Sequence, residues 1–97
     1  MRDLAALTVD DFRPLEGTTF LLKWDGHDLP VVLTEVTPLG RRRGDRDPFS
    51  LLFRGTPGTI LPQQIHHLSS DGFGELELFL VPVGADADAV TYEAVFT

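Results

Sequence analysis

The sequence predicts an all-β fold, either a small antiparallel β-barrel or a two-layer sandwich of about six strands, with one short N-terminal helix. Apolar residues alternate with other residues at a period of two in PFSLLFRG and in GELELFLVPVG, and only a strand turns such a pattern into one buried face. Short turn-forming segments separate these stretches, and no helical pattern is long enough for the crossover that parallel strands need. Neighbouring strands are therefore expected to be antiparallel.

The helix is expected at residues 8–14. Thr8 followed three residues later by Asp11 is typical of a helix start, and Pro14 ends the helix after a turn or two. At helical spacing three apolar side chains share one side of it, and they are expected to plug an open end or edge of the sheet: Val9, Phe12 and Leu15.

The first two strands are expected at residues 18–24 and 29–37. Asp25 and Gly26 join them, because this dipeptide tolerates the positive φ angles of a tight hairpin turn. The first strand directs alternate apolar side chains to one face: Phe20, Leu22 and Trp24. The second strand is partly apolar on both faces, and Pro30 near its start indicates an edge or a bulge.

Four more strands are expected, at residues 49–54, 63–70, 74–83 and 90–96. The pattern is strongest at 74–83, where alternate leucines are expected to form the central row of the core: Leu76, Leu78 and Leu80. Residues 38–48 have no apolar periodicity, and their charges, glycines and flanking prolines predict an exposed basic loop.

Length and charge limit the classes of protein that fit this chain. Its 97 residues are expected to form a single domain, residues 1–97. The formal net charge is −7, and residues 56–97 hold six acidic residues and no Lys or Arg. Such a surface repels phosphate and anionic lipid, which argues against nucleic acid or a membrane as the main partner. The N-terminus lacks the pattern of a signal peptide, so a cytoplasmic protein is expected.

No residue constellation predicts a catalytic, cofactor or metal site. Asp25, His27 and Asp28 lie close together in the sequence, but a solvated hairpin turn already explains this segment. His66 and His67 are adjacent, so in a strand they point to opposite faces, one toward solvent and the other half-buried, and cannot share a metal ion. We therefore expect no enzymatic activity and no cofactor.

Two sets of residues are candidates for contact with a protein partner or for self-association. The first lies in the basic loop, whose positive charge suits an acidic partner, although a run of charges is usually just a solvated surface: Arg41, Arg42, Arg43 and Arg46. The second is an apolar strip that shares one face of the strand at 74–83 with two glutamates: Phe79, Val81 and Val83. This strip is buried under the helix or a loop, lines a cavity, or forms an exposed interface.

Four segments together resemble the small bacterial domain-of-unknown-function family DUF6916: FSLLFRG at 49–55, LPQQ at 61–64, residues 74–84, and YEAVF at 92–96. The resemblance covers about residues 12–96 and rests on packing and turn motifs, so it implies the fold more than the function. Such proteins can be encoded beside phage-tail-collar-like proteins, so the resemblance also implies an accessory role in a phage-tail-like assembly. The family's typical aromatic residue after the LPQ segment is replaced here by His66 or His67.

The function expected from the sequence is that of a non-enzymatic β-module. It would act through protein-protein contacts as an accessory or structural component of a larger assembly, using a sheet edge or the strip of Phe79, Val81 and Val83. The alternative is a small-molecule-binding β-barrel.

Overall fold

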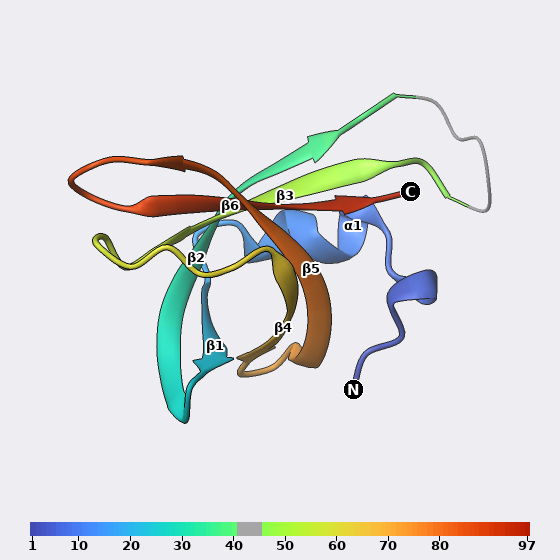
Figure 1. The fold of residues 1–97 in the computed structure, drawn as a ribbon. Coiled ribbons are helices and arrows are strands. Elements are labelled where there is room, and N and C mark those ends of the chain that lie inside the picture. The colour runs from blue at the N-terminus through green and yellow to red at the C-terminus, as the bar shows by residue number, and fades with distance from the viewer. Residues whose placement is uncertain (41–45) are drawn as a thin grey trace.

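A computed structural model of the chain describes residues 1–40 and 46–97. In these residues six antiparallel strands form a closed barrel in the order β1-β2-β3-β6-β5-β4 (Figure 1). This confirms the predicted all-β fold and selects the barrel over the sandwich. The strands are β1 (Thr19–Trp24), β2 (His27–Pro38), β3 (Phe49–Gly55), β4 (Gln64–Ser70), β5 (Gly74–Ala85) and β6 (Val90–Phe96).

The β1–β2 hairpin turns at the predicted dipeptide. Asp25 and Gly26 have φ angles of 50° and 78°, as a tight turn between twisted strands requires, and Trp24 pairs with His27 across the turn. Pro30 lies in the part of β2 that pairs with β1 only, because pairing with β3 begins at Val31. One side of β2 has no partner strand at this point, so a residue without an N–H donor is tolerated there.

A bulge in β2 explains why this strand is apolar on both faces. The register with β3 shifts between Leu33 and Glu35, so Thr34 is an extra residue, and its hydroxyl donates a hydrogen bond to the Leu52 carbonyl at 3.2 Å. The shift reverses the alternation of buried and exposed side chains. Val36 is therefore buried like Leu33, although regular alternation from Leu33 would place it on the opposite face.

The N-terminal segment forms three short helical turns, η1 (Leu4–Ala6), α1 (Val9–Phe12) and η2 (Arg13–Leu15). The Thr8 backbone N–H donates to the Asp11 carboxylate at 2.8 Å, as the predicted helix start implies. The α-helix is shorter than the predicted 8–14, because the chain tightens to 3-10 geometry at the turn that contains Pro14. The described helices include none that is long and apolar enough to cross a membrane.

Phe12 plugs the barrel, as the sequence predicts. Its side chain is fully buried, and its ring centroid lies 5.4 to 5.8 Å from three other phenylalanine rings: Phe49, Phe73 and Phe96. Val9 and Leu15 are partly buried against the same core. Tilted aromatic contacts at such distances add to the stability that burial of apolar area provides.

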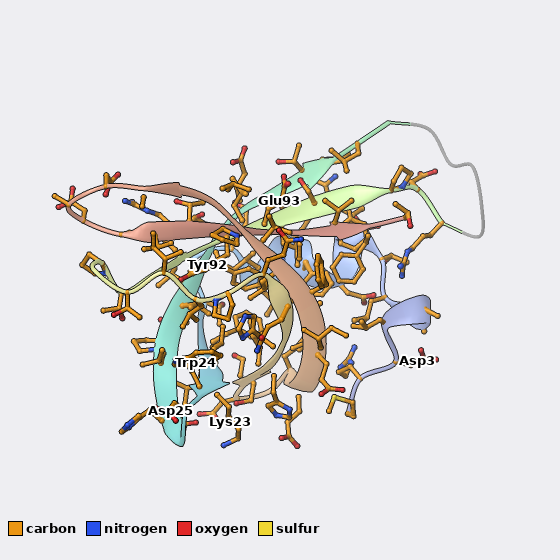
Figure 2. The ribbon with its side chains drawn as sticks, viewed as in Figure 1. Asp3, Lys23, Trp24, Asp25, Tyr92 and Glu93 are labelled. Carbon is orange, nitrogen blue, oxygen red and sulfur yellow. The ribbon has the colours of Figure 1, made fainter. Side chains whose placement is uncertain are left out.

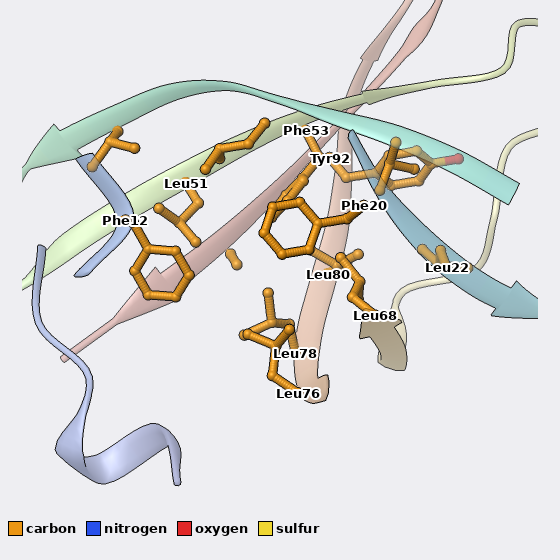
Figure 3. Packing of buried hydrophobic residues seen from close by; sticks show 14 of the residues in the cluster. Phe12, Phe20, Leu22, Leu51, Phe53, Leu68, Leu76, Leu78, Leu80 and Tyr92 are labelled. Atoms are coloured by element: carbon orange, nitrogen blue, oxygen red, sulfur yellow. The ribbon is translucent and has the colours of Figure 1, made fainter. Parts of the chain in front are cut away.

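The barrel interior is filled by aromatic and leucine side chains (Figure 3). Leu76, Leu78 and Leu80 are all buried, which confirms the predicted core row of β5. Phe20 and Phe53 meet edge to face at 5.7 Å across the interior. The Tyr92 hydroxyl accepts a hydrogen bond from the Leu61 N–H at 3.0 Å and so ties the segment before β4 to the barrel.

Leu78→Ala is expected to lower the free energy of unfolding by roughly 2 to 5 kcal/mol, because it removes buried methyl groups and leaves a cavity in a filled core. Urea denaturation measures the change. Its neighbour Glu77 is exposed, and Glu77→Ala should change the same free energy by less than about 0.5 kcal/mol. Equal effects of the two substitutions would contradict the assigned faces of β5.

The turn between β5 and β6 is held by one carboxylate. The backbone N–H groups of Asp88 and Ala89 donate to Asp86 Oδ1 at 2.8 and 2.9 Å. These hydrogen bonds favour the charged form and lower the pKa of Asp86, and Arg54 adds a smaller effect in the same direction.

Because the pKa of Asp86 is lower in the folded state, its contribution to stability is present above the unfolded pKa and is lost as the pH falls through the folded pKa. An NMR titration of the Asp86 carboxyl carbon should show a midpoint below the ordinary aspartate range. Asp86→Asn should remove this part of the acid dependence of the melting temperature. A midpoint at or above the ordinary value would refute the turn geometry.

Candidate interaction site between strands β5 and β6

Strand β5 changes its partner along its length, and this creates the candidate site. Residues 74–80 of β5 pair with β4, whereas β5 pairs with β6 only from Val81 onward, beginning at Val81 opposite Glu93. From the pair of Val81 and Glu93 back toward the start of β5, the two strands diverge. Figure 1 shows this where β5 crosses β6. Glu93 lies at this crossing (Figure 2).

A groove of about 390 Å³ occupies the space between the diverging strands. Its lining residues come from the N-terminal segment, the segment that precedes β3, the facing edges of β5 and β6, and the residue after β6: Leu4, Arg46, Leu78, Phe79, Val81, Glu93, Ala94, Val95, Phe96 and Thr97. Most of these side chains are apolar, so a ligand in the groove would be held mainly by burial of apolar surface.

An apolar patch adjoins this groove on the outer face of the barrel. Phe79 of β5 and Val95 of β6 line the groove and are 50% and 54% exposed. Ile65 of β4 is 62% exposed and lies directly opposite Phe79 in the β4–β5 ladder. With Val81, these residues form what we call the outer patch: Ile65, Phe79, Val81 and Val95. Exposed apolar side chains on three successive strands are unusual for a surface that faces only water.

The rim of the outer patch is acidic. Glu75 and Glu77 continue the exposed face of β5 beyond Phe79, and Glu93 stands opposite Val81 on β6. His67 Nε2 lies 2.8 Å from Glu75 Oε1, so this carboxylate already has a partner. Among the described residues neither Glu77 nor Glu93 forms an ion pair, so both carboxylates can meet a positively charged ligand.

Arg46 closes one end of the groove. Its Nη1 donates hydrogen bonds to the carbonyls of Leu4 and Leu7, the latter at 2.7 Å, and its Nε donates to the Thr97 carbonyl at 3.2 Å. The guanidinium carbon also lies 5.1 Å from the centroid of the Phe96 ring. The sequence pattern indicates Arg46 as a charge for an external partner, but its donors are directed at this chain's own carbonyls.

Arg2 fixes the other end of the same N-terminal segment. Its backbone N–H donates to the Glu75 carbonyl at 2.7 Å, and its Nη1 donates to the Phe73 carbonyl at 3.2 Å. The guanidinium carbon lies 4.4 Å from the centroid of the Phe73 ring. Residues 1–7 are thus fastened beside the groove at both ends.

The structure brings together part of the candidate set. Phe79, Val81 and Arg46 all line the groove. Val83 does not, because the β5–β6 register shifts between Pro82 and Gly84, and this bulge separates Val83 from the other two. The remaining basic candidates lie outside the described residues: Arg41, Arg42 and Arg43.

Sequence reasoning missed two members of the outer patch, Ile65 and Val95. Each occupies an outward position of its strand. Ile65 comes directly before buried His66, and Val95 lies between buried Ala94 and Phe96. The available signal was an apolar residue at a strand position that normally faces water. That the two residues lie near each other follows only from the strand order.

The histidines are placed differently from the sequence prediction. His66 is buried, not half-buried, and its Nε2 lies 2.9 Å from the Pro62 carbonyl. His67 points to the other face, as predicted, and is partly exposed beside Glu75. The Trp24 ring is tilted against the His66 ring, with 5.9 Å between centroids. Within residues 1–40 and 46–97, no three His, Cys, Asp or Glu residues are grouped so as to hold a metal ion.

Arg46→Ala is expected to lower the free energy of unfolding by about 1 to 3 kcal/mol, because three carbonyls lose a charged donor. Arg46→Lys should restore only part of this loss, since an ammonium lacks the planar fork of the guanidinium. Chemical denaturation measures both effects. The control is Arg54→Ala, which removes only an exposed contact of 3.9 Å to Asp86 and should change stability little. A loss for Arg54→Ala as large as that for Arg46→Ala would contradict the assigned role.

Comparison with known proteins adds the family. A search of curated proteins and a search of solved structures each gave no match. The model of one family, described as a domain of unknown function (DUF6916), matches residues 7–96, which include all six strands and the α1 plug. The chain therefore belongs to the DUF6916 family.

Proposed function

We propose that this protein is a non-enzymatic β-module that binds a protein partner through the outer patch, as an accessory or structural component of a larger assembly. The observation that carries the proposal is the set of exposed apolar side chains on β4, β5 and β6 around one groove. Burial of such a patch by a partner is favourable, and large apolar side chains surrounded by polar groups are typical of protein interfaces. A phage-tail-like assembly is the setting that the sequence resemblance favours.

The alternative, a barrel that binds a small molecule inside, has less support. Phe20, Phe53 and Tyr92 fill the interior together with several leucines, so a ligand would have to displace packed side chains (Figure 3). A second groove of about 390 Å³ lies outside the barrel at the β1–β4 seam, and its lining is more polar than that of the β5–β6 groove. The outer patch instead offers a partner exposed apolar side chains on three strands.

Val95→Ser and Val83→Ser form a matched pair that tests the proposal. Both valines are on the surface, with 54% and 52% of the residue exposed, but only Val95 lines the groove. The tagged wild-type domain is used to isolate a partner from its native host, and affinity for the purified partner is then measured by calorimetry. Val95→Ser should weaken binding by about tenfold, equivalent to about 1.4 kcal/mol, whereas Val83→Ser should leave it unchanged.

Light scattering of the same variants separates a foreign partner from self-association. If the patch joins two copies of this chain, the wild type and Val83→Ser should be larger than a monomer and Val95→Ser should be monomeric. If the two variants match the wild type in both partner affinity and association state, the outer patch is an ordinary surface and the proposal fails.

A further inference from the structure

The edge of β5 that faces the groove carries backbone groups that no strand of residues 1–40 and 46–97 pairs with. In an antiparallel ladder the N–H and C=O of successive residues point alternately to the two sides of the strand. The Glu75 carbonyl accepts the Arg2 N–H, so the backbone groups of Glu75 point away from β4 and into the gap. By the same alternation, the N–H and C=O of Glu77 and Phe79 also point into the gap, where the described chain supplies no strand to pair with them.

The positions beside this edge define what can pair with it. A strand laid along β5 would place one residue opposite Phe79 and, two residues away, another opposite Glu77, both on the outer face. The first of these would contact Phe79 and Val95, and the second would meet the Glu77 carboxylate. The residue between them would face inward over Leu78.

Charge distinguishes a foreign segment from a second copy of the domain. The rim holds Glu75, Glu77 and Glu93, whereas Arg46, which also lines the groove, donates to carbonyls of this chain. Two copies joined through this face would oppose acidic rims, which is unfavourable, whereas a segment with a Lys or Arg would complement them. Charge complementarity therefore selects a basic partner.

We propose that the gap between β5 and β6 binds an extended segment of a basic partner protein by strand addition to the β5 edge at Glu77 and Phe79. The segment has an apolar residue and a Lys or Arg two positions apart, and its backbone forms the hydrogen bonds that β6 does not make to this part of β5. The inference rests on the proposed function, because it specifies how the outer patch is occupied. Strand addition derives affinity from main-chain hydrogen bonds and specificity from alternate side chains.

Peptide selection tests this mode before the native partner is identified. A library of random nine-residue peptides is selected against the full chain, and the enriched sequence is synthesised and its affinity measured. Enriched sequences should contain an apolar residue and a Lys or Arg two positions apart. Methylation of the peptide's backbone nitrogens, one at a time, should then weaken binding by about tenfold or more at every second position and have little effect between them, because only alternate amides reach the β5 edge.

Charge reversal on the protein supplies the second arm. Glu77→Lys should lower the affinity for the selected peptide by about tenfold. The control is Glu35→Lys, which makes the same change at an exposed position of β2, a strand that pairs with neither β5 nor β6, and it should leave affinity unchanged. Circular dichroism verifies that both variants are folded.

The outcomes separate this inference from the proposed function. Enrichment of acidic or proline-rich peptides, no enrichment at all, or a methylation profile without alternation would overturn strand addition. If Val95→Ser still lowers the affinity for the native partner in that case, the outer patch remains an interface, but one that does not work by strand addition. If alternation is found but Val95→Ser does not affect the native partner, the edge binds peptide and the proposed function of the patch is wrong.

Discussion

Strand β5 cannot be paired on both edges along its whole length, and the rest of the structure follows from this constraint. It is twelve residues long, and it pairs with β4 at one end and with β6 at the other. Where β6 leaves β5, the N-terminal segment lies beside the uncovered stretch and fills part of it, since the Arg2 N–H donates to the Glu75 carbonyl and Leu4 lines the groove.

The filling is made by two kinds of interaction. Phe12 supplies apolar volume, since its ring contacts Phe49, Phe73 and Phe96 where the strands leave the barrel end open. Arg46 supplies directed hydrogen bonds, because backbone carbonyls left without a ladder partner need donors. The groove is what these two residues leave uncovered, so the candidate site is a by-product of how the barrel is closed.

Much of this fold is accessible from the sequence, and the unpredicted parts have physical reasons. Alternation locates all six strands, and the plug is visible because Phe12 recurs with Val9 and Leu15 at helical spacing. The bulges at Thr34 and Val83 are not predicted, because an inserted residue leaves the composition of a strand unchanged and shows only in the partner's register.

The candidate site is less accessible than the fold. Phe79 and Val81 are recognisable as an apolar strip within one strand, but the groove also depends on β6 lying next to β5 and on where that pairing stops. Arg46 resembles a surface charge in the sequence because its acceptors, the carbonyls of Leu4, Leu7 and Thr97, lie 39 to 51 residues away and carry no side-chain signature. Long-range contacts of backbone groups leave no local pattern.

The bonds of Arg46 also determine how the molecule opens. One guanidinium, in the segment that precedes β3, donates through Nη1 to the segment before α1 and through Nε to the residue that follows β6. Fraying at one of these two places loosens Arg46 and is therefore coupled to fraying at the other. A partner that stabilises either end would, through Arg46, slow hydrogen exchange at the other.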